Sequence, residues 1–307
     1  MAESALRIGT RGSRLARVQA DMVARALAAT GTPCQIVPIK TTGDRILDRP
    51  LADAGGKGLF TKELEEALLA ETIDIAVHSM KDVPVALPPG LGIAAVLERE
   101  DPADVFVSAV ARSLRALPAG ARVGTSSVRR AAQLRRARPD LVPVLLRGNV
   151  DTRLKKLDDG EMEAVILALA GLKRLGLQAR AVDILPTDEW LPSLAQGAVG
   201  IEIRANDGRA AAAVSPLEHA PTAIALACER AFQQALDGSC KTPIAGLATL
   251  NGGRLWFRGE VLAPDGSDFA AIGFDRDLVD CGKLEAARAG REAGVVLQPQ
   301  AAQWLAH

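Results

Sequence analysis

Aromatic residues are scarce in this sequence: they make up 3% of its 307 residues, and tyrosine is absent. Proteins that bind single-stranded nucleic acid stack bases on aromatic side chains, so this scarcity argues against such a role. Net charge is lacking as well, because 37 basic residues balance 37 acidic ones. A general attraction to nucleic acid or to an anionic membrane is therefore not expected, and any anion site must come from a local arrangement of charge.

Long apolar runs and metal ligands are also lacking. No segment has the length of apolar sequence that spans a bilayer, and residues 1–11 lack the apolar core of a signal peptide. We therefore expect a cytoplasmic protein without a membrane partner. The sequence has three histidines, and its four cysteines, Cys34, Cys228, Cys240 and Cys281, show no Cys-x-x-Cys spacing. This pattern predicts neither a metal site nor a disulfide framework.

The composition that remains is globular, and strand-like runs alternate with helical patterns up to about residue 203. Such alternation predicts α/β domains. The first unit has expected strands at 6–10, 35–40 and 73–77, with helices beginning near Ser13 and Thr61. A second unit has expected strands at 121–124, 142–146 and 164–168, with helices from Ser127 and over 150–158. A strand at 199–203 is expected to return to the first unit.

The pattern changes after residue 215. We expect a helix over 222–236 and then three strand-like runs, separated by Asn251-Gly252-Gly253 and Pro264-Asp265-Gly266. These tripeptides are hairpin turn signals, so the last part is predicted to be a smaller antiparallel α+β domain. Together with a charged break at Asp101-Pro102, this predicts three domains: residues 1–97 with 198–215, residues 98–197, and residues 216–307.

One short segment is repeated. Residues 7–14 read Arg-Ile-Gly-Thr-Arg-Gly-Ser-Arg and residues 122–129 read Arg-Val-Gly-Thr-Ser-Ser-Val-Arg, so four of the eight positions are identical. Each copy joins an expected strand to the start of an expected helix. Two similar domains that face a shared cleft explain this repeat.

Arginine is concentrated in residues 122–138, which contain six Arg and no acid. Arg129 and Arg130 fall in the first turn of a helix, where the helix dipole disfavours a cation. A helix N-terminus with hydroxyl and guanidinium groups is a good anion receptor, and Arg11 and Arg14 repeat this arrangement. We interpret both as anion sites, whereas a solvated basic face is the better interpretation for the later arginines of the segment, Arg135, Arg136 and Arg138.

Three other segments carry reactive or charged groups. Lys57 lies in the Gly-rich run 55–58, which suggests a mobile flap or a plain surface loop. Lys81 and Asp82 lie in residues 78–84, which directly follow the expected strand 73–77; there they fit proton transfer and stabilisation of a cation, or a simple surface pair. Cys240 lies in a Gly-Ser loop beside a lysine, which favours an ionised thiol, whereas Cys34 and Cys228 have apolar neighbours and are expected to pack.

Taken in order, six segments resemble the hydroxymethylbilane synthase family, also called porphobilinogen deaminase. They are Arg7-Ile8-Gly9-Thr10-Arg11, Gly55-Gly56-Lys57-Gly58-Leu59-Phe60, His78-Ser79-Met80-Lys81-Asp82-Val83-Pro84, Gly124-Thr125-Ser126-Ser127-Val128-Arg129-Arg130, Leu146-Arg147-Gly148-Asn149-Val150 and Gln196-Gly197-Ala198-Val199-Gly200. The resemblance extends to about residue 246 and is looser beyond residue 250. It implies that the first two domains are similar to type II periplasmic binding proteins.

The resemblance also implies a reaction. Cys240 would carry a dipyrromethane cofactor through a thioether, onto which four porphobilinogen molecules are added head to tail with loss of ammonia, and water would release hydroxymethylbilane. Asp82 would be the catalytic carboxylate that assists protonation of the leaving amine and stabilises the azafulvene cation. The groups implied to bind the cofactor and substrate are Arg11, Ser13, Lys57, Ser79, Lys81, Thr125, Ser127, Arg129, Arg130, Arg147, Arg153 and Arg174.

The same resemblance predicts a monomeric transferase of porphyrin and heme biosynthesis whose product passes to uroporphyrinogen-III synthase. One departure is Asp53, where related flaps often have a second lysine. Two other classes remain open at this point. The chain could be a small-anion binding protein of periplasmic-binding-like fold without chemistry, because fold does not determine function, or a nucleic-acid binder that uses residues 122–138.

Overall fold

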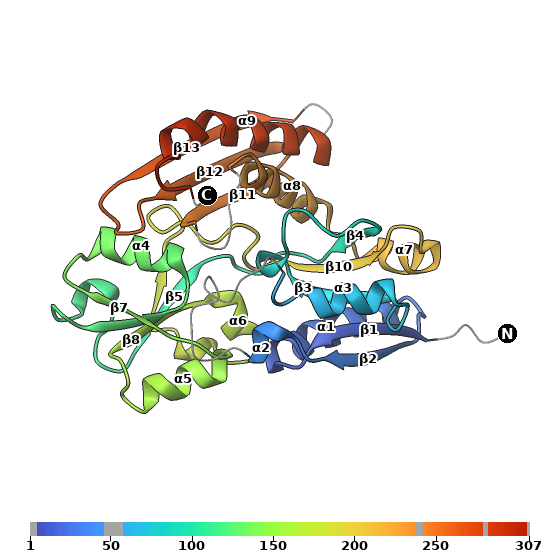
Figure 1. Ribbon diagram of the computed structural model, residues 1–307, viewed down its shortest axis with the longest axis horizontal. Helices are drawn as coiled ribbons and strands as arrows, with labels where there is room; N and C mark the ends of the chain where they lie inside the picture. The colour runs from blue at the N-terminus through green and yellow to red at the C-terminus, as the bar shows by residue number, and fades with distance from the viewer. Residues whose placement is uncertain (1–4, 46–57, 237–241, 279–281, 306–307) are drawn as a thin grey trace.

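The computed structural model describes residues 5–45, 58–236, 242–278 and 282–305, and its strands form three separate sheets (Figure 1). The first sheet has the strand order β2-β1-β3-β10-β4. Its strands are β1 (Leu6–Arg11), β2 (Cys34–Ile39), β3 (Ile75–Ser79), β4 (Leu91–Val96) and β10 (Val199–Arg204). Its helices are α1 (Arg14–Ala29), α2 (Thr42–Arg45), α3 (Lys62–Leu69) and α7 (Gly208–Val214).

The first sheet is buried on both faces, as its continuous apolar strands require. Ile8, Ile75 and Ile201 pack with apolar side chains of α1 and α7 on one face. On the other face, Ile73 and Ala76 pack against α3.

The second sheet has the strand order β7-β6-β8-β5-β9. Its strands are β5 (Asp104–Ser108), β6 (Arg122–Thr125), β7 (Val142–Leu145), β8 (Ala164–Ala168) and β9 (Asp183–Leu185). Helix α4 (Val128–Ala137) covers one face, and α5 (Val150–Asp158) and α6 (Leu169–Arg174) cover the other.

The two sheets follow the same plan. In each, three neighbouring strands are parallel and the fourth and fifth alternate in direction, so that β2-β1-β3-β10-β4 corresponds to β7-β6-β8-β5-β9. The repeated segments 7–14 and 122–129 occupy equivalent places, at β1–α1 and at β6–α4. The fourth strand of each sheet follows a crossing of the chain between the sheets. The predicted pair of similar α/β domains is confirmed.

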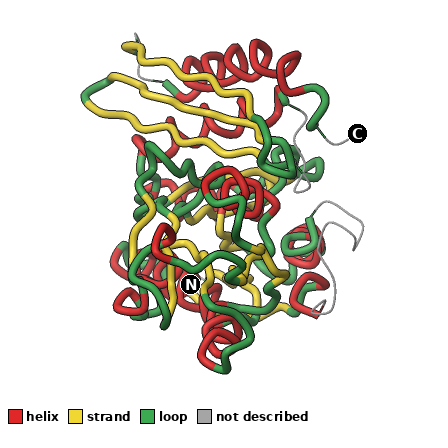
Figure 2. Tube along the Cα trace, turned by 90° about the vertical axis from the view of Figure 1, so that its left-hand side faces the viewer, coloured by secondary structure: helices red, strands yellow, loops and turns green. Residues whose placement is uncertain are grey.

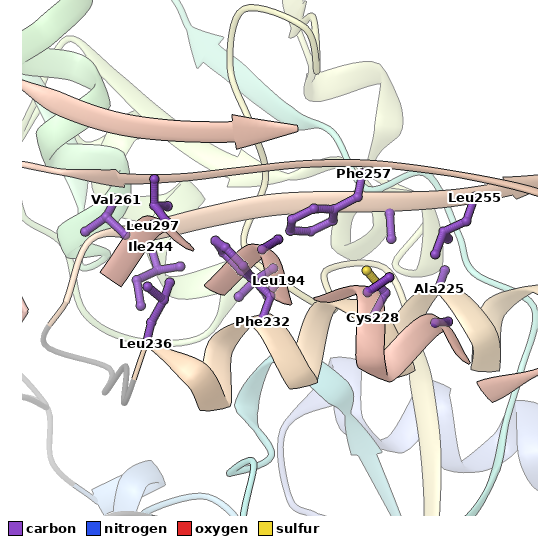
Figure 3. Packing of buried hydrophobic residues seen from close by; sticks show 14 of the residues in the cluster. Leu194, Ala225, Cys228, Phe232, Leu236, Ile244, Leu255, Phe257, Val261 and Leu297 are labelled. Atoms are coloured by element: carbon purple, nitrogen blue, oxygen red, sulfur yellow. The ribbon is translucent and has the colours of Figure 1, made fainter. Parts of the chain in front are cut away.

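The last part of the chain is a smaller α+β domain, as predicted. A meander of β11 (Ile244–Asn251), β12 (Arg254–Leu262) and β13 (Phe269–Asp277) packs against α8 (Ala220–Ala235) and α9 (Lys283–Ala301). Gly252 and Gly253 both have positive φ in the two-residue hairpin turn between β11 and β12, which glycine adopts at little cost. Phe232 and Phe257 meet edge to face in the core, where Cys228 is also buried (Figure 3). Figure 2 shows this domain above the other two.

Several elements differ from the sequence prediction. Strand β3 begins two residues later than expected, at Ile75, because the chain is still turning at Glu71, whose φ is 55°. Strands β4, β5 and β9 and helix α9 were not predicted. The helix predicted over 222–236 is α8, which begins two residues earlier, at Ala220. The predicted domain boundaries stay a prediction, because the order of strands in a sheet does not define the residue at which a domain ends.

Candidate active site

A cavity of about 770 Å³ lies between the first two domains. Its walls come from the segments that follow β1, β3, β6 and β7, which is the edge of parallel sheets where α/β proteins bind ligands. Among the described residues that line it, Asp82 is the single carboxylate, and eight are cations: Arg11, Lys40, Lys81, Arg129, Arg130, Arg147, Arg153 and Lys156. The cavity is therefore suited to a ligand with several negative charges.

Asp82 lies at the end of a 3-10 turn, Met80–Asp82, that directly follows β3. Its side chain is 32% exposed, and its Oδ2 is 3.7 Å from Nη1 of Arg11. The guanidinium of Arg11 in turn lies 3.9 Å from the centre of the Phe60 ring. A cation–π contact of this kind holds Arg11 beside the carboxylate, which remains open to the cavity.

Lys81 lines the cavity next to Asp82. Its Nζ donates a hydrogen bond to Oε1 of Gln196 at 3.1 Å. Burial, together with the positive charge of Arg130, lowers the pKa of Lys81 to about 8. The residue therefore stays a cation at neutral pH, and it loses its charge at a lower pH than an ordinary lysine.

Arg129 and Arg130 share one buried carboxylate, that of Asp104 on β5. Nη2 of Arg129 lies 2.9 Å from Oδ2, and Arg130 approaches both oxygens, with Nη2 2.6 Å from Oδ1. Burial alone would raise the pKa of the Asp104 carboxyl, but the two guanidinium groups outweigh it and hold that pKa well below its usual range. Trp190 and Gln196 also donate to Asp104.

This network gives the two arginines at the helix N-terminus a buried protein partner, which the sequence analysis did not predict. Both arginines line the cavity, but both are buried, and part of their charge is offset by Asp104. The first turn of a helix disfavours a cation, and the carboxylate of Asp104 offsets this cost for Arg129 and Arg130 without any ligand. Their binding role stays a prediction.

Two serines cap the helices at equivalent places in the two domains. The hydroxyl of Ser13 accepts from the backbone N–H of Ala16, and that of Ser127 accepts from the backbone N–H of Arg130, both at 3.3 Å. The prediction that a helix begins near Ser13 is thus confirmed. Thr125 is buried, and its hydroxyl accepts from the N–H of Ser127. The positive ends of α1 and α4 therefore face the same cavity, and this favours an anion.

Arg147 and Arg153 lie on the wall that follows β7. Burial lowers the pKa of both guanidinium groups, that of Arg153 to about 10, with a further contribution from neighbouring arginines. Arg153 is held by hydrogen bonds to the carbonyl of Gly148 and the hydroxyl of Ser126. Cations gathered in this way repel one another, and an anionic ligand relieves that repulsion.

A smaller cavity of about 80 Å³ shares Lys81, Arg130 and Arg153 with the first, and adds Ser79 and Arg174 to the site. Nη2 of Arg174 donates to the carbonyl of Gly197 at 2.6 Å. Its Nε is buried without a hydrogen-bond partner among the described residues. A buried N–H in this state is a donor available to a ligand.

Two predicted residues, Lys57 and Cys240, lie outside the described residues, as does Cys281. Of the other cysteines, Cys34 is partly buried and Cys228 is fully buried, and burial raises the pKa of both thiols. Both therefore favour the protonated form, and this confirms the expectation that they pack rather than react.

The arginines assigned to a solvated face are absent from the described lining of the cavity, but they are not merely solvated. Arg136 pairs with Glu260 on β12 at 2.9 Å, and Arg135 donates to the carbonyl of Pro264, so both join the second domain to the third. Arg138 pairs with Asp140.

Sequence reasoning missed several groups of the site. Asp104 and Gln196 form its buried centre, and Phe60, Lys40 and Lys156 add to its walls. Gln196 falls in a segment that resembles the family, which was a usable signal. Asp104 lies in the charged stretch that was interpreted as a domain boundary. A single acidic residue at the start of an apolar run does not predict a pairing with Arg129 and Arg130.

Among the described residues, no group of three or more histidine, cysteine, aspartate or glutamate side chains is placed to hold a metal ion. A search of the same residues finds no helix with the length and apolar character that crossing a membrane requires.

The fold and the site define a class: a protein of two equivalent α/β domains with a cationic cavity between them and a third α+β domain. Among solved structures, similar folds include a putative methionine-binding lipoprotein of Bacillus subtilis, with 13% identity over 70% of this chain and 90% of that chain and a TM-score of 0.44. A periplasmic substrate-binding protein of an ABC transporter from Coxiella burnetii has 14% identity over 71% and 93%, with a TM-score of 0.45.

Family models identify the chain further. Residues 6–212 match "Porphobilinogen deaminase, dipyromethane cofactor binding domain", and residues 223–288 match "Porphobilinogen deaminase, C-terminal domain". The chain belongs to the porphobilinogen deaminase family, also called hydroxymethylbilane synthase. It is a transferase of porphyrin biosynthesis with a dipyrromethane cofactor.

Proposed function

We propose that this enzyme joins four porphobilinogen molecules head to tail, with loss of ammonia, on a dipyrromethane primer attached through a thioether to Cys240, and releases hydroxymethylbilane by hydrolysis. The observation that carries this proposal is the charge of the interdomain cavity, whose described lining has eight cations and one carboxylate. A growing chain of pyrroles, each with an acetate and a propionate, is a polyanion and needs such a lining.

The residues present fit the cofactor. Its two pyrroles bring four carboxylates, and a cavity of about 770 Å³ is within the usual size of small-molecule sites. The buried Nε of Arg174 offers a donor without a protein partner. The described side chains that would hold the cofactor and the incoming substrate are Arg11, Ser13, Ser79, Lys81, Thr125, Ser127, Arg129, Arg130, Arg147, Arg153 and Arg174.

When bound, the cofactor supplies the pyrrole carbon on which the first substrate is added. The assignment of the proton transfer to Asp82 is supported by its being the single carboxylate among the described cavity residues. Asp82 assists protonation of the substrate amine, which leaves as ammonia when its bond to the methylene carbon breaks, and the carboxylate then faces the positive charge left on the substrate pyrrole. Nη1 of Arg11 lies 3.7 Å from the Asp82 carboxylate, and Lys81 binds a substrate carboxylate beside it.

We further propose that the enzyme works as a cytoplasmic monomer and passes its product to uroporphyrinogen-III synthase. The position of the family in porphyrin biosynthesis supports the cytoplasmic location and the partner. A small-anion binding protein without chemistry is not favoured, because both family models are those of an enzyme.

The intact mass of the purified protein tests the proposal. We expect a mass increment equal to one dipyrromethane, and peptide mapping that places it on Cys240. Cys240→Ser should lose both the increment and the turnover of porphobilinogen, whereas Cys34→Ser should keep both. Active enzyme with an unmodified Cys240 would contradict the proposal, and binding of anions without release of ammonia would favour the binding protein.

A further inference from the structure

One arginine of the C-terminal domain reaches the chain beside Asp82. Arg230 lies on α8, and its guanidinium donates hydrogen bonds to three successive backbone carbonyls, those of Val83, Pro84 and Val85, at 3.1, 2.7 and 3.1 Å. These residues directly follow Asp82 in a stretch that belongs to no helix or strand. An irregular segment of this kind is mobile unless contacts hold it.

Apolar contacts hold the other side of the same turn. Met80 and Val83, which flank Asp82 in the sequence, are 2% and 5% exposed and belong to one buried cluster with Ala223 and Leu226 of α8. The N–H of Val83 donates to the carbonyl of Met80 and closes the turn. Helix α8 therefore contacts the turn through both apolar side chains and a charged one.

The position of Arg230 has an energetic cost that its three acceptors offset. Burial lowers the pKa of its guanidinium, and the negative charge of Glu202 on β10 opposes that change. The Glu202 carboxylate is itself paired with His78 at 2.9 Å. A buried cation is tolerated where its N–H groups are satisfied, so the carbonyls of residues 83–85 and Arg230 stabilise each other.

Helix α8 is itself fixed to the rest of the molecule. Glu229, the residue before Arg230, pairs with Arg99 at 2.6 Å and accepts hydrogen bonds from the backbone N–H groups of Ala195 and Ala248. These partners lie on the segments that cross between the first two domains and on β11. Arg230 thus extends from a rigid support, which is what placing a side chain to within a fraction of an ångström requires.

We propose that Arg230 is a positioning residue for Asp82: it holds the backbone after the turn, and so keeps the carboxylate at the place where proton transfer occurs. The proposal rests on the catalytic role proposed above for Asp82. This positioning role differs from a purely structural role in joining the domains. A residue that only joined the domains would affect stability and leave the chemical step of the folded enzyme unchanged.

The test compares Arg230→Met with Arg204→Met. Arg204 is the control, because it also clamps two backbone carbonyls, those of Leu68 and Ile73, both at 2.8 Å, but neither carbonyl belongs to the turn of Asp82. Arg204 also pairs with Asp74 and Asp207, so its replacement tests loss of stability away from the turn. We expect Arg230→Met to lower kcat about tenfold or more while KM changes less than about threefold, since a small displacement of a catalytic group costs rate more than binding. Arg204→Met should keep kcat within about twofold of the wild type at a similar loss of stability.

Two further measurements complete the test. Arg230→Lys, which can reach fewer carbonyls, should have a kcat between those of the wild type and Arg230→Met, and it replaces the Met variant if that protein does not fold. Hydrogen–deuterium exchange, which needs no substrate, should show faster exchange over residues 80–85 in the Arg230 variants and not in Arg204→Met.

Normal kcat in a folded Arg230 variant, or unchanged exchange over residues 80–85, would overturn the proposal. A wild-type enzyme that does not consume porphobilinogen would instead overturn the proposed function, and the exchange comparison would still decide whether Arg230 holds the turn.

Discussion

Replacing Asp104 by asparagine tests the buried centre of the site. Asp104 is fully buried, and its two oxygens accept five hydrogen bonds from side-chain N–H groups. Oδ2 faces Arg129, Arg130 and Trp190, whereas Oδ1 faces Arg130 and Gln196. An asparagine of the same shape must turn its NH₂ group toward one of these sets, so at least two donors lose their acceptor.

The magnitude follows from that geometry. Each buried donor left without a partner costs about 1–3 kcal/mol, and removing one member of a buried ion pair costs about 3–5 kcal/mol. These contributions overlap, so we expect Asp104→Asn to lower the free energy of unfolding by about 3–5 kcal/mol. Asp140→Asn is the control, because it breaks an exposed pair with Arg138 and should change stability little.

Urea unfolding followed by tryptophan fluorescence measures the difference, since Trp190 contacts Asp104 directly. The pKa of Asp104 is lower in the folded protein than in the unfolded one. The contribution of Asp104 to the free energy of unfolding is therefore complete above the pKa of the unfolded state, and it is lost as the pH falls toward the pKa of the folded state. The difference in the free energy of unfolding between the wild type and Asp104→Asn should therefore become smaller below about pH 4. A gap of less than about 1 kcal/mol at neutral pH would refute this account of the network.

Three further results are expected at the cavity. Asp82→Asn should fold normally but turn over porphobilinogen at least about a hundredfold more slowly, and Asp82→Glu should retain more activity than the Asn variant; near-normal steady-state turnover by Asp82→Asn would show that this carboxylate is not catalytic. Arg129→Leu and Arg130→Leu should impair assembly of the cofactor or early elongation more than Arg136→Leu, as intact masses of the three variants at matched stability would show; equal loss in all three would contradict this. The pKa of Lys81 is about 8, so kcat/KM should fall as the pH rises through that value and the ammonium loses its proton, whereas Lys81→Arg should stay charged and lack this decline; an identical pH profile for both would argue against a binding role for Lys81.

The local features of this protein could be predicted from the sequence. The buried strand β8 reads as a short apolar run, and β8 and α5 have the predicted bounds. The serine before α1 and the glycines between β11 and β12 act through the backbone within a few residues. Such features depend on neighbours in the sequence, so the sequence alone determines them.

Elements whose stability comes from distant contacts were missed. Helix α9 buries mainly small residues, among them Ala286, Ala289 and Gly290, and a Cβ at Gly290 would lie 2.0 Å from the carbonyl oxygen of Cys228 on α8. Close approach to another helix selects these small residues, and they leave no strong apolar pattern in the sequence. Strand β9 has three residues and exists because β5 pairs with it.

The site divides in the same way. The sequence determined which residue types surround the cavity: the Gly-Thr segments, the Arg pair after β6, and Lys81 and Asp82 after β3. Only the tertiary structure decided how the charges are paired, because Asp104 meets Arg129 and Arg130 from a different strand. It also decided that Arg230, 148 positions after Asp82 in the numbering, holds the next three residues. The strength of a charge pair depends on distance and burial in space, and neither quantity is written in the order of the residues.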